Sequence, residues 1–557
     1  MFIRRLTRHK AGKSYTYLKV VENFWKGGKT RQRTIVNFGN IGRWNPQKVN
    51  WLIGQLQQVF GLPRTAAASE VGILRSQHFG THYAGHLVWE SLNLSELLAK
   101  LLKRFRVEFD PVPVLKAMVL NRLSDPRSKL AVSRWLPHQC IPDVPEQIPL
   151  QHFYRSLHYL ARIQIPLEKA LFLQLRTLLN LDLSLVFYDL TSSYFQGRKC
   201  PLARHGYSRD HRFDRMQIEL ALLVNGDGLP IAHRVFAGDV KDVGTVPEII
   251  RDLQRQFEIR RCIFVGDSGM VSEAILDQLR EAGYEYILAL KARVDNKADQ
   301  ILDLLPPAER FEQIKPDTLY AHELPHPVVW ADRPRWNQDR FAACRYQETA
   351  QRDREDREGR LAESEEFLRE FIDPRRKRFR NQPERIHAQI ARFLKKQRTT
   401  RYFQYEYHRP GEFTYSRIED EIRRDARHDG LFLLQSNSDR LALPDLVGGY
   451  ITLAQVESAF REIKDFLHLR PIRHWSEEAV RGHVFICVLA YLLERVLEQT
   501  LKGKQEMTAR SALEALESVD AVTYDLRGET LRKRTDLNAS QKAIFKALGA
   551  DPVPVVF

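Results

Sequence analysis

Three carboxylates are candidates for chemistry because of the segments that carry them. Asp189 ends an apolar run, residues 183–189, and Asp267 ends a second such run further along the chain. The ends of strands are where α/β sheets present binding and catalytic groups. Glu457 lies within residues 450–464, whose apolar positions recur at the helical period. Three oxygen ligands from separate elements suit Mg²⁺ or Mn²⁺, since these ions prefer carboxylates and retain water ligands.

A pair of such ions would supply chemistry at a phosphodiester. Two ions about 4 Å apart activate an attacking oxygen and stabilise the leaving oxygen. Asp189, Asp267 and Glu457 are therefore the candidate ligands for Mg²⁺, with Mn²⁺ as a substitute. Each carboxylate alone also has an ordinary explanation, because an Asp after a strand is often a turn former and a lone helical Glu is often a solvated rim residue. The chemical interpretation depends on all three meeting.

The helix expected over residues 450–464 has an apolar face with a polar stripe at its border. The apolar face consists of Leu453, Val456, Phe460, Ile463 and Leu467. Tyr450, Glu457 and Lys464 follow one another at spacings of seven residues, so they share one stripe along the helix. We expect the apolar face to pack on a sheet and the stripe to face a ligand.

The elements around the two aspartates predict an α/β core. Three strands are expected over residues 183–189, 216–225 and 229–236, the last two joined at a Gly-Asp-Gly turn. A helix, a strand, a second helix and another strand follow, at residues 245–256, 261–267, 272–281 and 284–290. The order β-β-β-α-β-α-β is that of the first part of an RNase H-like core, a mixed sheet flanked by helices.

Changes in sequence pattern divide the chain into six segments. Charged helical sequence interrupts the α/β pattern after residue 295, and a sheet-like run resumes it at residues 429–435. The expected segments are a basic β-hairpin module at 1–45, a helical DNA-binding or dimerisation region at 46–180, the first part of the RNase H-like core at 181–295, an insertion domain at 296–428, the second part of the core with the Glu457 helix at 429–500, and a helical C-terminal tail at 501–557.

The charge balance favours a polyanionic partner. Lys and Arg number 86 against 70 Asp and Glu, which gives a formal net charge of +16, and the pI is about 9.5. A protein of this charge is suited to nucleic acid, although a merely basic surface is the alternative. Two groups of basic residues are candidates for contact with DNA phosphates: those of the N-terminal hairpin, and Arg375, Arg376 and Lys377. The alternative for both groups is a solvated surface.

Cysteine usage and hydropathy predict a soluble, cytoplasmic protein. The five cysteines include no close pair, which argues against a disulfide scaffold and against a zinc site. The N-terminus turns polar at once, and the longest apolar run, residues 484–493, is too short to span a bilayer. We expect a cytoplasmic, nucleoid-associated protein without a membrane partner, and a buried helix at residues 484–493.

The sequence resembles a DDE transposase of a bacterial insertion sequence, in the large insertion-sequence-four superfamily. This group is marked by the signature Y-x2-R-x3-E-x6-K, and Tyr450, Glu457 and Lys464 fall on its spacing. The flanks Asp189-Leu-Thr-Ser-Ser-Tyr-Phe195, Gly266-Asp-Ser-Gly-Met270 and Leu469-Arg-Pro-Ile-Arg-His474 also resemble blocks of this family. One position departs from the signature, since Leu453 stands where the family has Arg.

The resemblance implies roles for further residues. Lys464 would contact a phosphate near the scissile bond, and Tyr450 would contact the backbone or a flipped nucleotide. Arg461 and Arg470 are the alternative candidates to replace the missing signature arginine, and Lys291 and Arg293 are weaker candidates for DNA contact. A homodimer in a synaptic complex is expected from the resemblance alone.

The function that the resemblance implies is metal-dependent DNA transposition, with two Mg²⁺ ions bound by the three acids. The chain would bind the terminal inverted repeats of its insertion sequence, cleave the ends by two-metal hydrolysis and join the 3′-hydroxyl ends to double-stranded target DNA. An RNase H-like nuclease without strand transfer shares the same acids. A non-catalytic DNA-binding regulator derived from a transposase is the alternative from another class, and retention of all three acids disfavours it.

Overall fold

The computed structural model describes residues 1–10, 12–61, 71–179, 185–241, 244–259, 262–266, 272–290, 301–307, 310–328, 337–372, 382–408, 412–526, 529–551 and 553. Chain contacts divide it into two compact units. The smaller unit contains residues 1–76 and 522–533, and the larger contains residues 77–521 and 534–554.

The smaller unit contains the predicted hairpin. β2 (Lys13–Lys26) and β3 (Lys29–Asn40) pair antiparallel around Gly27 and Gly28, which both have positive φ as this tight turn requires. A third strand that was not predicted, β1 (Phe2–Lys10), pairs with β2. Helix α1 (Pro46–Val59) follows, with Asn45 as its N-cap and Pro46 in its first turn.

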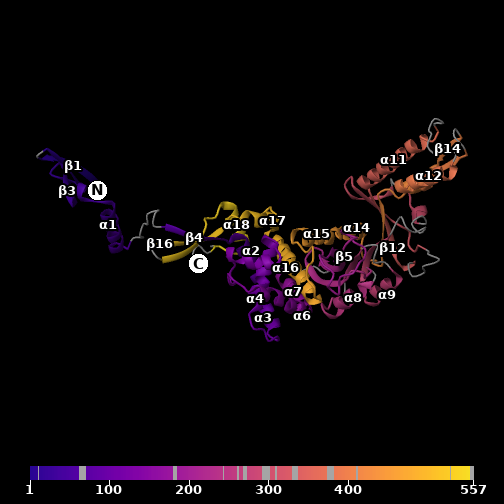
Figure 1. The fold of residues 1–557 in the computed structure, drawn as a ribbon, viewed down its shortest axis with the longest axis horizontal. Helices are drawn as coiled ribbons and strands as arrows, with labels where there is room; N and C mark the ends of the chain where they lie inside the picture. Colours follow the sequence, from indigo (N-terminus) through magenta and orange to yellow (C-terminus); the bar gives the residue numbers. More distant parts are fainter. Residues whose placement is uncertain are drawn as a thin grey trace. The chain divides into compact units, whose positions relative to one another are not determined.

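A nine-stranded mixed sheet forms the centre of the larger unit, and Figure 1 shows it between two layers of helices. The strands are β5 (Leu185–Tyr194), β6 (Gln217–Asn225), β7 (Pro230–Ala237), β8 (Ile263–Gly266), β9 (Glu285–Leu290), β10 (Glu312–Lys315), β11 (Leu319–Glu323), β12 (Arg340–Tyr346) and β15 (Leu431–Ser436). Their order is β10-β11-β12-β15-β9-β8-β5-β6-β7. β5 is antiparallel to β6 but parallel to β8, and β8 is parallel to β9.

The predicted order β-β-β-α-β-α-β is confirmed, with α8 (Val246–Arg255) and α9 (Glu273–Glu281) between the strands. These helices cover one face of the sheet through an apolar cluster that includes Tyr188, Ile249 and Ile275. The opposite face packs against α14 (Leu443–Ile451), α15 (Ala454–Arg461) and α16 (Glu477–Leu501). In Figure 1, α14 and α15 lie on one side of β5, and α8 and α9 lie on the other.

A helical layer extends this second core. It contains α2 (Gly80–Ser91), α3 (Leu94–Leu102), α4 (Pro111–Ser124), α5 (Lys129–Trp135), α6 (Leu150–Arg162), α7 (Gln164–Leu179), α17 (Ala509–Leu516) and α18 (Ala539–Ala547). Most of α16 is buried here, as its long apolar run predicts. Gly482 allows α16 to approach α6 closely, because a Cβ at this position would lie 2.2 Å from the Leu157 carbonyl oxygen.

Two sequence expectations about secondary structure are wrong in detail. Residues 46–180 are not all helical, because β4 (Val71–His78) lies within them. The C-terminal tail is not purely helical either, since β16 (Asp520–Leu526) and β17 (Glu529–Arg534) join β4 in a sheet of order β17-β16-β4. Within the helical region, Asn93 separates α2 from α3 and has φ of +50°. β4 and β16 pair although they lie more than 400 residues apart in the sequence, and such long-range pairing leaves no local signal.

The predicted insertion has two structural parts. β10, β11 and β12 extend the central sheet through antiparallel pairing of β12 with β15. Residues 347–429, which we call the lobe, form a separate small core from α11 (Gln347–Arg369), α12 (Pro383–Gln397), α13 (Glu419–Ala426) and the hairpin of β13 (Phe403–Tyr407) with β14 (Phe413–Arg417). Arg345 and Leu431, which flank the lobe, are register partners in the sheet.

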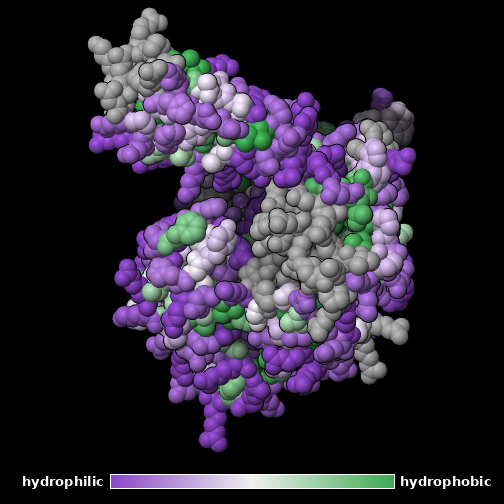
Figure 2. All heavy atoms as spheres, turned by 90° about the vertical axis from the view of Figure 1, so that its right-hand side faces the viewer, coloured by the Kyte–Doolittle hydropathy of each residue, from purple (hydrophilic) through white to green (hydrophobic). Residues whose placement is uncertain are grey.

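The surface is mostly hydrophilic on the face that Figure 2 shows, where apolar residues form only small scattered patches. Among the described residues, no helix is both long enough and apolar enough to cross a bilayer. All five cysteines are buried and free, and burial raises the pKa of Cys262 to about 12.

Candidate active site

Asp189 does not end its strand, contrary to the expectation. β5 continues to Tyr194 because it keeps an antiparallel partner along its whole length, and Asp189 is opposite Leu222 of β6. On its other edge, β5 pairs with β8 only as far as Phe187 and Val265. Asp189 therefore lies two residues beyond the last paired position on the β8 side. Its partly exposed side chain accepts a hydrogen bond from the Leu190 amide through Oδ1 at 2.7 Å.

The alternation of side chains along β5 shows which face Asp189 occupies. Val186, Tyr188 and Leu190 belong to the apolar cluster beneath α8 and α9. Leu185 and Phe187 belong to the opposite cluster, which contains the buried residues of α15. Because side chains two residues apart share a face, Asp189 lies on the face covered by α15.

Glu457 lies on that same covering helix. Val456, Ala459 and Phe460 anchor α15 to the sheet, and each is at most 5% exposed. Glu457 itself is exposed, and it makes no hydrogen bond or ion pair with any residue that the structure describes. The structure therefore brings the strand of Asp189 and the helix of Glu457 to one face of the sheet, and Glu457 is accessible there.

Asp267 lies outside the described residues, as do Lys291, Arg293, Arg375, Arg376 and Lys377. β8 is described to its last residue, Gly266, which is the residue before Asp267. Within β8, Val265 faces the cluster beneath α15 and Phe264 faces the opposite cluster.

The predicted helix over residues 450–464 is not continuous. Between α14 and α15 the amides of Leu453 and Val456 bond to carbonyls three residues earlier, which tightens the turn. After α15 the chain widens into a π-helix at Glu462–Phe466, where the Leu467 amide bonds to the Glu462 carbonyl five residues earlier. The predicted apolar face is nevertheless confirmed, since all five of its members are buried.

These changes of pitch give the members of the polar stripe different surroundings. Tyr450 is half-buried and its ring lies 5.6 Å from that of Phe432. Arg461, at the end of α15, is exposed one turn after Glu457. Lys464, in the π-helix, is only 8% exposed.

Lys464 belongs to a buried ionic cluster that the sequence did not predict. Its Nζ lies 2.7 Å from Oδ1 of Asp210, and the same oxygen lies 2.5 Å from Nη1 of Arg470. The Asp210 side chain is 4% exposed. Burial lowers the pKa of Lys464, and the Asp210 carboxylate opposes that effect. Asp210 comes from the long connection between β5 and β6, so no local pattern links it to Lys464.

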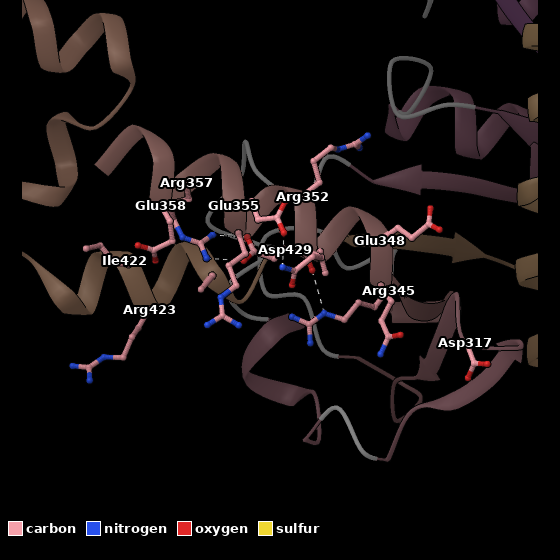
Figure 3. A pocket seen from close by; sticks show the side chains of 15 residues that line it. Asp317, Arg345, Glu348, Arg352, Glu355, Arg357, Glu358, Ile422, Arg423 and Asp429 are labelled. Carbon is pink, nitrogen blue, oxygen red and sulfur yellow. Dashed lines mark hydrogen bonds and ion pairs between the residues drawn. The ribbon is translucent and has the colours of Figure 1, made fainter. Parts of the chain in front are cut away.

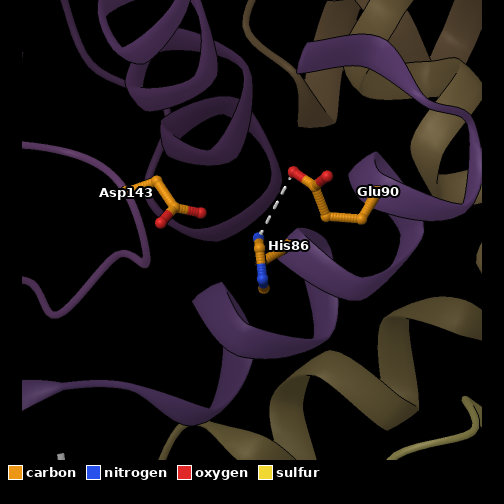
Figure 4. A group of neighbouring side chains, drawn as sticks. All are labelled: His86, Glu90 and Asp143. Carbon is orange, nitrogen blue, oxygen red and sulfur yellow. Dashed lines mark ion pairs between the residues drawn. The ribbon is translucent and has the colours of Figure 1, made fainter. Parts of the chain in front are cut away.

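A second carboxylate cluster has the composition of a metal site but is occupied by a lysine. Figure 4 shows His86, Glu90 and Asp143 grouped within the helical layer. The buried Lys116 places its Nζ 2.8 Å from His86 Nδ1 and 3.4 Å from a carboxylate oxygen of each acid. An ammonium group at this position already supplies the positive charge, so the cluster is a structural ion group.

A cavity among the described residues lies apart from Asp189 and Glu457. It has a volume of about 910 Å³ and lies where α11 and α13 of the lobe meet the sheet. Figure 3 shows Arg357 directed at Asp429 within it, with Nη1–Oδ1 and Nη2–Oδ2 distances of 2.6 and 2.7 Å. Arg345 donates to the Asp429 carbonyl at 3.1 Å. Equal numbers of Arg and acidic residues line the cavity, so it has no charge preference for a polyanion.

Comparison with known protein families decides the classification. The family model described as a transposase DDE domain matches residues 181–493, more than half of the chain. The chain belongs to the transposase DDE domain family. The model of the IS1634 family transposase N-terminal domain matches residues 3–57, so this DDE transposase is of the bacterial insertion-sequence type.

A solved structure is also similar to this DDE transposase. It is a cryo-EM structure of a piggyBac transposase synaptic complex with hairpin DNA, 10% identical in sequence, with a TM-score of 0.34 over 87% of this chain and 85% of that one. Among curated proteins, none matches the chain. Family membership makes DNA the class of partner and a divalent metal ion the class of cofactor.

Proposed function

We propose that this DDE transposase cleaves the ends of its insertion sequence and joins the freed 3′-hydroxyl groups to target DNA, with Asp189, Asp267 and Glu457 as its metal ligands. The main support for this proposal is that Asp189 and the helix of Glu457 lie at the same face of the sheet. Asp189 lies on the face that α15 covers, and Glu457 is accessible on α15. An RNase H-like core is the finer description that we propose for the sheet, because β7-β6-β5-β8-β9 combines three antiparallel strands with two parallel additions.

Asp267 is proposed as a ligand from its place in the sequence. It is the residue after Gly266, which is the last described residue of β8, and Val265 of that strand belongs to the apolar cluster beneath α15.

The donor set suits Mg²⁺ because it consists of carboxylate oxygens on an accessible face. When bound, two ions would supply activation of the attacking oxygen and charge stabilisation of the leaving oxygen. The chain's own contribution is to hold the carboxylates on a rigid sheet and helix, and to bind the polyanion with its basic surface. Arg461 is the exposed cation closest in sequence to Glu457, and we propose that it contacts a phosphate.

The remaining DNA-contact assignments are proposals of different kinds. Tyr450 is partly accessible for a backbone contact. Lys464 would need to act from its buried ion pair with Asp210. Lys291, Arg293, Arg375, Arg376 and Lys377 stay proposals based on sequence. A homodimer in the synaptic complex, a cytoplasmic location and double-stranded terminal repeats as the substrate are also proposed on family grounds.

The test is cleavage of labelled DNA from both ends of the native locus by the full-length protein in Mg²⁺. We expect Asp189→Asn, Asp267→Asn and Glu457→Gln each to lower the rate by on the order of 1,000-fold, which corresponds to about 4 kcal/mol. Asp445→Asn is the matched control, because Asp445 is an exposed acid on the neighbouring α14. EDTA should abolish cleavage.

Three outcomes separate the candidate functions. Joined products identify a transposase, whereas cleavage without joining identifies a nuclease. Specific binding without cleavage by the wild-type protein identifies a regulator. Equal cleavage by the wild type and the three acid variants would refute the assignment of the site.

A further inference from the structure

The connection between β5 and β6, residues 195–216, presents exposed cations and aromatic rings that the carboxylate site does not explain. It carries six Arg or Lys residues and only two acids. Its exposed aromatic side chains are Tyr207 at 73% and Phe213 at 61%. Trp475, on the neighbouring segment, is 65% exposed. Exposed aromatic rings interleaved with cations offer stacking faces and positive charge to the same ligand.

The neighbouring segment is tied to this connection by several contacts. Lys199 places its Nζ 4.4 Å from the centroid of the Trp475 ring. Phe195 forms an isolated bridge with Ile472, and Arg473 donates to Gln196 at 2.9 Å. The start of the connection therefore lies against residues 472–475. We call the connection together with these residues the basic aromatic surface.

Several of its cations have no carboxylate partner. Arg198, Lys199 and Arg204 are exposed, and none forms an ion pair with a residue of the described chain. Arg212 and Arg215 share Asp214 as a partner. The unpaired cations leave positive charge beside the aromatic rings, which suits an anionic ligand with flat faces.

The surface is anchored to the elements that carry the acids. Asp210, within the connection, binds Lys464 seven residues after Glu457. The connection begins at the end of β5, five residues beyond Asp189, which is about 17 Å at the rise of a strand. That span corresponds to about five nucleotide steps along one DNA strand.

We propose that the basic aromatic surface binds unpaired nucleotides of the DNA that flank the cut, with Tyr207 and Phe213 stacking on bases and Arg198 and Lys199 contacting phosphates. This inference rests on the proposed function for its choice of DNA. Stacking platforms flanked by cations are how proteins bind single strands without reading their sequence. A surface for duplex DNA alone would need the cations but not the exposed rings, because paired bases hide their faces.

The test measures binding of the full-length protein to two fluorescent DNA probes in EDTA at fixed salt, so that no cleavage occurs. One probe is a fully paired end of the native element, and the other is the same end with three unpaired nucleotides. We expect Tyr207→Ala to weaken binding of the unpaired probe by about tenfold, with little effect on the paired probe. Phe213→Ala should behave in the same way.

Matched variants separate stacking from other effects. Tyr207→Phe retains the ring and should bind as the wild type does, and Leu173→Ala removes an exposed apolar side chain from α7 and should change neither probe. Arg198→Ala with Lys199→Ala should weaken both probes and reduce the slope of log affinity against log salt by about 0.7 per cation on a single strand.

The proposal is overturned if Tyr207→Ala weakens both probes equally, if it weakens neither, or if the wild-type protein shows no preference for the unpaired probe. These outcomes are independent of cleavage. Cleavage by the wild type without any probe preference would refute this inference alone. A probe preference that depends on the rings, without cleavage in Mg²⁺, would refute the proposed function alone.

Discussion

Glu494 is a buried acid whose replacement should stabilise the protein above neutral pH. It lies in the middle of α16 and is 6% exposed. Its Oε2 has no hydrogen-bond partner in the described structure, and its Oε1 lies 4.0 Å from Nη2 of Arg510. Burial and the nearby Glu498 raise its pKa to about 7, against the opposing effect of Arg495.

The size and direction of the effect follow from this pKa. The unfolded chain has the ordinary glutamate pKa of 4.5, so between pH 4.5 and 7 the folded chain binds more protons than the unfolded chain. Stability therefore falls as pH rises through this window and stays low above it. A shift of about 2.5 pKa units at about 1.4 kcal/mol each gives a penalty of about 3 kcal/mol at pH 8. Glu494→Gln should remove it.

The assay is urea unfolding at pH 5, 6, 7 and 8, read by pulsed hydrogen exchange of the peptides that span α16. This readout isolates the core that contains Glu494 from the rest of the chain. Glu494→Gln should match the wild type near pH 4.5 and exceed it by about 3 kcal/mol at pH 8. Glu517→Gln, at an exposed acid after α17, is the control and should keep the wild-type profile. A wild-type stability that is flat between pH 5 and 8, or a variant no more stable at pH 8, would refute the reasoning.

Two further substitutions test the packing around the site. Asp210→Asn removes the carboxylate that Lys464 and Arg470 share, so it should lower the free energy of unfolding by about 3 kcal/mol. In thermal unfolding, the double variant that adds Lys464→Met should recover part of this loss. If the effects of the two substitutions on stability simply add in the double variant, the ion pair is contradicted. Leu453→Arg restores the family signature residue at a position where the side chain is 6% exposed, so it should lower the free energy of unfolding by about 3 kcal/mol. The control Leu453→Met introduces a side chain of similar volume and should lower it by less than about 1.5 kcal/mol. Equal thermal unfolding midpoints for the two variants would show that the site tolerates charge.

Periodicity predicted those parts of the fold that local sequence determines. The strands and helices from β5 to β9 were predicted in the right order because each has its own apolar pattern and turn residues. The apolar face that begins at Leu453 was also correct in every member. By contrast, the pairing of β4 with β16 joins segments far apart in the chain, and no alternation in either segment identifies its partner.

The local structure around the candidate site could not be predicted from the sequence. Asp189 was expected at the end of its strand, yet the strand runs five residues further because β6 remains paired beyond β8. The continuous helix was wrong because a tight turn precedes Glu457 and a π-helix follows it. Asp210 was missed because its importance comes from contact with Lys464, 254 residues away in sequence.

The attachment of the lobe has a consequence for how the chain is built. The chain leaves the central sheet at Arg345 and returns at Leu431, its direct partner in the antiparallel pair of β12 and β15. In topological terms the whole lobe is therefore the loop of a β-hairpin. The entropy of closing a loop grows only by about 0.6 kcal/mol for each doubling of its length. A sheet with this junction accepts either a two-residue turn or an entire domain between β12 and β15 with the same strand order. The length of this insertion is therefore free to vary without any change to the face of the sheet that carries Asp189.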